Sequence, residues 1–194
     1  EEREAVETMT ELIEYYKGIF TILSSCASRQ LEEVTFRRTV IPVQELLDAA
    51  GKYFKKSMKN RSERIELEIE PMEAKVIGDV NQLRFLLENL IDEALTVRED
   101  GLIRLQARQD NEYIRFLFTD TRREKSVEEL NQLFYPNLAR MTSGEKGELR
   151  GTEYLVCKQI IRDHDEFAGR RGCRINAEPA EGGGFTVYFT IPRR

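Results

Sequence analysis

Two polar side chains with ligand chemistry, Asn89 and Glu93, lie four positions apart in a segment whose apolar residues repeat with helical spacing. Residues at this spacing share one face of a helix, so both side chains can face a cleft while their apolar neighbours are buried. The carboxylate of Glu93 is also a good ligand for a hard divalent cation. The pair therefore predicts a polar edge on a core helix that could contact a ligand or a metal ion.

The helix that carries this edge is predicted to run from Val80 to about Val97. Asp79 is its expected N-cap, and Gln82, three residues on, makes a variant of the capping box. The core stripe that must be buried consists of Val80, Leu83, Leu87, Leu90, Ile91 and Ala94.

The other predicted elements are helices and strands in mixed order along the chain. The polar segment 120–150 is long for a compact domain, and such loops often act as functional lids. Before the helix at 80–97, the pattern predicts an extended stretch at 36–41, a helix from Pro42 through Phe54, and strands at 65–69 and 76–77. After it, the pattern predicts two strands, 102–107 and 113–118, joined by a turn at 110–111. A short helix at 127–134, a longer helix at 152–163, and a hairpin that pairs 174–177 with 185–191 complete the chain.

The N-terminal residues 5–35 have apolar side chains at alternating spacings of three and four, which is a heptad seam. The seam consists of Val6, Met9, Ile13, Tyr16, Phe20, Leu23 and Ala27. Flanking Leu12, Ile19 and Cys26 widen it, as in helical bundles. The pattern predicts a helix that associates with partner helices; the alternative is that it packs on the chain's own domain.

Composition narrows the function classes. The 194 residues carry a net charge of −5, which gives no basis for nucleic-acid binding, and contain no apolar run of the ~20 residues that a bilayer helix needs. The three cysteines lack metal or disulfide spacing, as expected for a cytoplasmic protein. His164 is the only histidine, which excludes a multi-histidine metal site, and it is expected to be an ordinary helix-terminal residue. The start at Glu1 suggests a piece of a longer parent.

Three stretches, in order, now resemble one family. Residues 78–94 look like the N box of histidine-kinase ATP-binding domains, a fold shared with gyrase-type ATPases. Residues 151–161 resemble the helix after the family's last glycine box, and 182–192 resemble its closing strand. Arg29 to Glu32 also resemble the second helix of the family's dimerisation hairpin. The resemblance implies an α+β fold, a two-layer α/β sandwich with a mixed sheet covered by helices, preceded by a dimerisation helix: domains 1–35 and 36–194.

The resemblance also implies a site for ATP and Mg²⁺. Asn89 and Glu93 occupy the positions of two amides that face the triphosphate, the second of which ligates Mg²⁺. Asp120 matches the aspartate that accepts a hydrogen bond from the adenine amino group, and Gly151 is the one glycine kept of two in the last box. A carboxylate at Glu93 repels phosphate by ~4 kcal/mol at ~4 Å and an effective dielectric constant of ~20.

Several positions depart from the family pattern. Bulky residues at 121–124 replace glycines beside the base, and Glu153 brings negative charge to a helix N-terminus that should receive phosphate. The family's phosphoacceptor histidine is missing from the N-terminal helix; an acceptor helix is expected upstream of Glu1 if the parent has one.

Two principal hypotheses follow. The first is a bacterial two-component-type signalling module: a pseudokinase with weak or lost ATP binding that acts as a homodimer. Its expected partners are a response regulator or upstream sensor domains, and any membrane association is expected only through a longer parent protein. The alternative is an active autokinase domain with an atypical lid, in which Glu93 holds Mg²⁺ and Arg122 or Arg123 contacts phosphate. A structural or interaction protein of similar topology and unrelated role is the third.

Overall fold

The computed structural model describes residues 36–135 and 152–194, six helical positions (5, 6, 9, 10, 13 and 16), and the backbone at 142–143 and 149–150. The chain forms two compact units. Residues 36–135 and 153–194 make up the core unit; residues 1–35 and 136–152 make up the second. Most of the predicted N-terminal helix lies outside the described residues, and the division into domains 1–35 and 36–194 stays a prediction.

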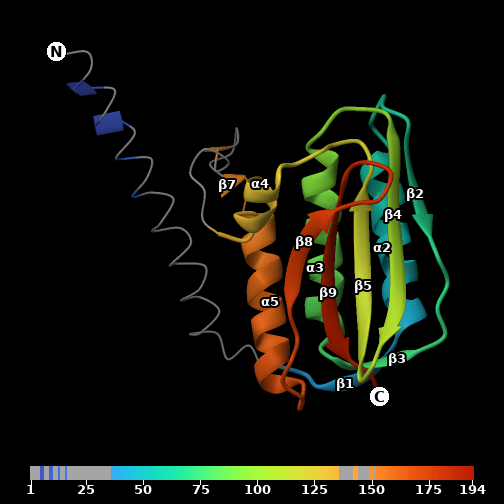
Figure 1. Cartoon of the computed structure of the whole chain (residues 1–194). Coiled ribbons are helices and arrows are strands. Elements are labelled where there is room, and N and C mark those ends of the chain that lie inside the picture. The colour runs from blue at the N-terminus through green and yellow to red at the C-terminus, as the bar shows by residue number, and fades with distance from the viewer. Residues whose placement is uncertain are drawn as a thin grey trace. The chain divides into compact units, whose positions relative to one another are not determined.

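The core unit is built on a five-stranded sheet with the order β2-β4-β5-β9-β8 (Figure 1). The strands are β2 (Ile65–Ile69), β4 (Gly101–Asp110), β5 (Tyr113–Asp120), β9 (Phe185–Pro192) and β8 (Ile175–Pro179). β2 pairs with β4 in parallel and the other pairs are antiparallel, so the sheet is mixed. β1 (Thr39–Pro42) and β3 (Lys75–Gly78) form a small antiparallel pair. In the second unit, β6 (Thr142–Ser143) pairs with β7 (Leu149–Arg150).

Three long helices cover one face of the sheet: α2 (Val43–Met58), α3 (Val80–Leu95) and α5 (Glu153–Phe167) (Figure 1). The short helix α4 (Val127–Asn131) lies between α3 and α5 in the sequence and ends three residues earlier than predicted, whereas α5 continues four residues further than predicted. The predicted α+β class, a two-layer sandwich with a mixed sheet, is confirmed.

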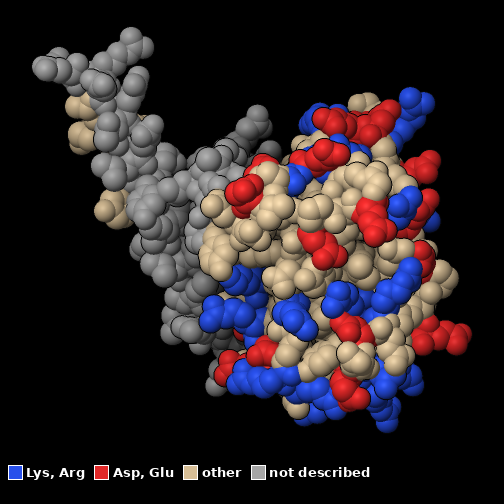
Figure 2. Space-filling view, in the orientation of Figure 1, with Lys and Arg blue, Asp and Glu red and all other residues tan. Residues whose placement is uncertain are grey.

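The uncovered face of the sheet carries charges of both signs, which Figure 2 shows interspersed among uncharged residues. Neighbouring strands place opposite charges side by side, with Arg104 3.0 Å from Glu68 and Arg108 2.6 Å from Glu70. Such exposed pairs contribute little to stability. These alternating charged side chains make this face of the sheet compatible with solvent, whereas the opposite face is buried.

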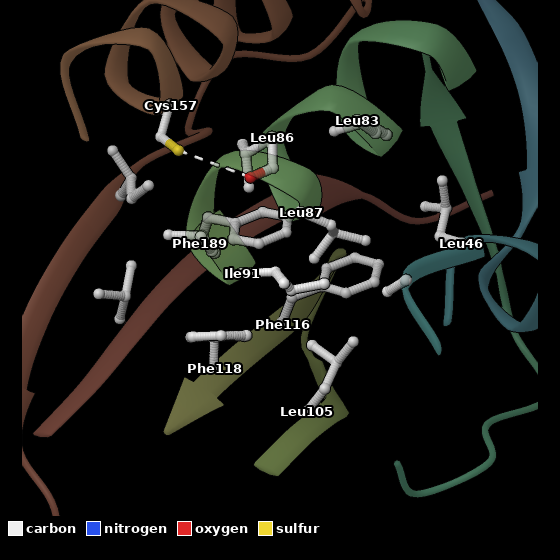
Figure 3. Close-up of a cluster of buried hydrophobic side chains, with 14 of the residues drawn as sticks. Leu46, Leu83, Leu86, Leu87, Ile91, Leu105, Phe116, Phe118, Cys157 and Phe189 are labelled. Atoms are coloured by element: carbon white, nitrogen blue, oxygen red, sulfur yellow. Dashed lines mark hydrogen bonds between the residues drawn. The ribbon is translucent and has the colours of Figure 1, made fainter. Parts of the chain in front are cut away.

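The core lies where alternate strand residues meet the helices (Figure 3). The rings of Phe116 and Phe189 stack with centroids 4.8 Å apart, and both are almost fully buried. On the helix side the Cys157 thiol donates to the carbonyl of Leu86 at 3.6 Å, which joins α5 to α3. Burial raises the pKa of Cys157, so this thiol stays protonated and is a structural group.

Asp79 is the N-cap of α3, as predicted. Its Oδ1 accepts hydrogen bonds from the main-chain N–H groups of Asn81 and Gln82 at 3.0 and 3.1 Å. The expected capping box is wrong, however, because the side-chain oxygen of Gln82 has no hydrogen-bond partner in the described part of the chain. Oδ2 of Asp79 is instead engaged by the main-chain N–H of Arg37 at 2.8 Å, which ties the segment before β1 to α3.

Candidate functional site

A buried ion pair stands at the end of β5. Nε and Nη2 of Arg122 donate to Oδ1 and Oδ2 of Asp120, both at 2.9 Å, and the main-chain N–H of Arg122 donates to Oδ1 at 3.0 Å. The two side chains are 1% and 2% exposed. Both carboxylate oxygens of Asp120 are therefore occupied by a residue two positions away in the same chain.

The other donors of Arg122 reach the C-terminal end of α3. Nη2 donates to the carbonyl of Ala94 at 2.6 Å, and Nη1 donates to those of Val97 at 3.3 Å and Glu99 at 3.1 Å. A guanidinium has five N–H groups, and these contacts together with the Asp120 pair use every one. Arg122 thus links the end of a strand to the end of the helix that carries Asn89 and Glu93.

Further basic and aromatic side chains crowd the same region. Nε of Arg123 lies 3.4 Å from Oδ2 of Asp120, and the Arg123 guanidinium lies 5.8 Å from the centre of the buried Phe185 ring. The ammonium of Lys125 lies 5.5 Å from the same ring. The residues that follow β5 therefore lie over the start of β9, beside Asp120.

Asn89 and Glu93 both lie on α3, with Asn89 8% exposed. The Asn89 amide donates to the carbonyl of Phe85, one turn earlier in its own helix, at 2.7 Å. Burial and, next, the charge of Glu93 raise the pKa of Tyr154 well above its usual value, with a smaller contribution from Asp120. The charges of Glu93 and Asp120 thus both act on Tyr154, in the first turn of α5.

No group of three or more histidine, cysteine, aspartate or glutamate side chains within the described ranges could hold a metal ion. Metal binding by Asn89 and Glu93 stays a prediction. Gly151 lies outside the described residues, as do residues 136–141 and 144–148 of the predicted lid. Glu153, in the first turn of α5, has a buried Oε2 without a hydrogen-bond partner in the described part of the chain.

His164 lies in the last turn of α5, as expected for a helix-terminal residue, and it is fully buried. Nε2 accepts from the main-chain N–H of Asp79 at 3.1 Å, and Nδ1–H donates to the carbonyl of Ile160 at 2.8 Å. The ring of Phe36 meets it edge-on, with centroids 4.8 Å apart. A Cβ on Gly78 would lie 2.8 Å from the imidazole, so a glycine here makes room for it. His164 anchors the segment that enters the core unit.

Lowering the pH below about 6.5 should destabilise the core unit through His164. Burial holds the pKa of this imidazole below its ordinary value of 6.5, despite the opposing effects of Ile160, Asp79 and Asp163. The unfolded chain therefore binds a proton that the folded chain does not, and stability falls as pH drops from 6.5 towards the folded pKa, by at most ~1.4 kcal/mol per pH unit. Urea unfolding at several pH values, compared with His164→Gln, measures this slope; identical slopes contradict the prediction.

The described helices include none long and apolar enough to cross a membrane. A search of curated proteins found no match for the sequence. Among solved structures, the nucleotide-free catalytic domain of histidine kinase ThkA superposes with a TM-score of 0.63 at 21% identity, over 81% of this chain and 96% of that one. A mycobacterial sensor histidine kinase, MprB, gives 0.61 at 20% identity, over 81% and 99%.

Histidine kinase AdeS of Acinetobacter baumannii gives a TM-score of 0.60 at 15% identity, over 96% of this chain and 79% of that one. These likenesses agree with the mixed sheet and the three covering helices. The family model for histidine kinase-, DNA gyrase B- and HSP90-like ATPases matches residues 78–194, which span α3, the whole of β4 to β9 and the Asp120 region. The chain belongs to this family of histidine-kinase-like ATPases.

Proposed function

We propose that this chain is a two-component-type signalling module that keeps the histidine-kinase ATPase fold, binds ATP weakly or not at all, and acts through dimerisation and contacts with protein partners. The observation that carries the proposal is the buried pair of Arg122 and Asp120, in which the aspartate that the family resemblance assigns to adenine already has both oxygens occupied.

The energetic comparison favours the internal ligand. The adenine amino group is a neutral donor, whereas Arg122 offers a charge-assisted, bidentate contact, and such contacts are roughly twice as strong as neutral ones. Arg122 is also held by three main-chain carbonyls, so a purine would have to break five hydrogen bonds to replace it. Adenine therefore does not fit beside Asp120 in this arrangement.

The phosphate side is unfavourable for a different reason. One N–H of the Asn89 amide donates to the carbonyl of Phe85 in its own helix, so this N–H is not available to a phosphate. Glu93 and Glu153 each add a negative charge where the resemblance places phosphate. Since like charges close together repel strongly at low effective dielectric constant, these residues oppose a triphosphate unless a cation offsets them.

Titration with a non-hydrolysable ATP analogue tests the proposal. In the presence of about 5 mM Mg²⁺, we expect isothermal titration calorimetry at micromolar protein concentration to show no saturable heat of binding. A site with a typical Kd of ~1 µM corresponds to about 8 kcal/mol of binding free energy, which the blocked pocket cannot supply. Saturable, Mg²⁺-dependent binding in the micromolar range would sink the pseudokinase proposal and favour the active autokinase.

Two variants make this titration sharper. Glu93→Asn restores an amide on the predicted phosphate edge, and Glu88→Gln removes the same charge elsewhere on α3. If Arg122 is the obstacle, neither variant gains affinity. A gain confined to Glu93→Asn would mean that the base site is open and that charge alone weakens binding.

Dimerisation is proposed through the N-terminal helix. Of its seam residues, Val6, Met9 and Ile13 are helical and 62%, 62% and 52% exposed in the single chain. A row of exposed apolar side chains at heptad spacing is what two helices bury against each other. A response regulator is the proposed further partner, in keeping with the similar structure of ThkA in complex with the response regulator TrrA. We assign the module to the cytoplasm, as the family resemblance implies.

Met9→Glu should convert the dimer to a monomer, because it buries two like charges in the seam at adjacent positions of the partner helices. Sedimentation velocity at ~10 to 100 µM measures the change. Thr8→Glu adds the same charge outside the seam and is expected to leave the dimer intact. A dimer that survives Met9→Glu, or one lost equally in both variants, contradicts the seam.

A further inference from the structure

The groups around Arg122 form a cradle made only of hydrogen-bond acceptors. It consists of the Asp120 carboxylate and the main-chain carbonyls of Ala94, Val97 and Glu99, and it surrounds a side chain that is 1% exposed. A site with one negative charge, several acceptors and almost no water selects a cation with many donors in one plane. Guanidinium, with five N–H groups in a fixed fork, fits this description; an ammonium has only three.

The location of the cradle explains why it exists. The last carbonyls of a helix have no partner within the helix and carry the negative end of its dipole. No basic residue in the last turn of α3 serves them. Arg122, two residues after β5, reaches the carbonyl of Ala94 in the last turn of α3 and those of Val97 and Glu99 just beyond it. Gly101 makes room for the Arg122 side chain, since a Cβ at Gly101 would lie 2.6 Å from Cγ of Arg122.

We propose that this cradle is a guanidinium-binding site whose resident ligand is Arg122, and that the occupied cradle holds the end of α3 against the end of β5 without any nucleotide. This inference rests on the proposed function and deepens it. Because Arg122 fills the site from within the chain, the end of α3 and the end of β5 stay in contact whether or not a nucleotide is bound. The chemical class that completes the site is an alkylguanidinium, not a purine.

The test is chemical rescue. Arg122→Ala removes the atoms of ethylguanidinium, so that compound is the matching probe. The variant should unfold on the order of 10 °C below the unaltered chain, from the loss of one partner of a buried pair. Adding ethylguanidinium at up to ~20 mM should raise its Tm in a saturable way, as any ligand of the folded state does. Ethylammonium at the same concentration should not.

The unaltered chain supplies the control, because its cradle is full and its Tm should not rise with ethylguanidinium. Equal effects of the two cations, or equal effects on the variant and the unaltered chain, overturn the proposal. Rescue and nucleotide binding are measured independently, so the two proposals can fail separately. Rescue together with micromolar binding of the ATP analogue refutes the proposed function and supports the guanidinium site. Absence of both rescue and binding refutes the guanidinium site and supports the proposed function.

A second variant covers the case in which Arg122→Ala does not fold. Arg122→Lys keeps the charge and reduces the donors from five to three, so it should still lower the Tm by several degrees, more than Arg123→Lys does. Arg123 is a suitable match because it contacts Asp120 through a single ion pair at 3.4 Å. Equal stability of Arg122→Lys and the unaltered chain overturns the specificity for guanidinium.

Discussion

Replacing Asp120 by alanine is expected to lower the free energy of unfolding by about 3 to 5 kcal/mol, since it leaves the guanidinium of Arg122 buried without its counter-ion. An aspartate that served only to bind adenine would line an open pocket, and its loss would reduce affinity with little effect on stability. Here the carboxylate is 2% exposed and accepts both bonds of a bidentate pair. Urea unfolding followed by circular dichroism measures the difference; guanidinium chloride is unsuitable because it is itself a ligand of the proposed cradle.

The control is a second Asp–Arg pair, at the surface, in which the same two arginine donors, Nε and Nη2, contact one carboxylate oxygen, Oδ2. Asp110 accepts from Nε and Nη2 of Arg115 at 3.1 and 2.8 Å, but the two side chains are 31% and 33% exposed. Asp110→Ala should cost less than ~1 kcal/mol. A similar cost for both aspartates contradicts the structural role of Asp120.

A double-mutant cycle isolates the coupling. Arg122→Ala with Asp120→Ala removes both charges, so the combined loss should be smaller than the sum of the two single losses, by up to ~3 kcal/mol for groups in one network. Additive losses would mean that Arg122 stabilises the domain through its contacts with α3 alone, and that Asp120 is free for another partner.

The elements of the fold could be predicted because each carries a local pattern. Strands β4 and β5 alternate apolar and polar residues, so Leu105 and Phe116 face the helices while Arg104 and Arg115 face water. The stripe of α3 and its N-cap Asp79 are equally local. The parallel pairing of β2 with β4 follows from no local pattern and was accessible only through the family resemblance.

The state of the candidate site could not be predicted in the same way. The sequence shows that a bulky residue, Arg122, stands close to Asp120 where the family pattern has glycine. It does not show in which direction the Arg122 side chain points. That direction depends on carbonyls of Ala94, Val97 and Glu99, more than twenty residues earlier in the chain. His164 is a similar case, since its burial depends on Gly78 and Phe36 from other elements.

Gly184→Ala should be the most damaging small substitution in the glycine run before β9. Gly184 has φ +81°, and a Cβ there would lie 2.1 Å from the carbonyl oxygen of Asp120 and 2.7 Å from Cα of Thr121, both main-chain atoms. Because the backbone cannot give way as a flexible side chain can, β9 must separate from the end of β5. The left-handed conformation costs ~1 to 2 kcal/mol and overpacking ~1 to 3 more, so we expect a loss of about 3 kcal/mol in the free energy of unfolding.

Gly182→Ala separates the two contributions. Gly182 has a similar φ, +87°, but a Cβ there would meet nothing within 4 Å, so only the conformational cost of ~1 to 2 kcal/mol applies. Urea unfolding of both variants gives the difference directly. If the two lose the same stability, the close approach of β9 to Asp120 is not what fixes this strand end. If Gly184→Ala loses more, the close approach of the chain just before β9 to the main chain of Asp120 and Thr121 fixes this strand end, and with it the position of the Asp120–Arg122 pair.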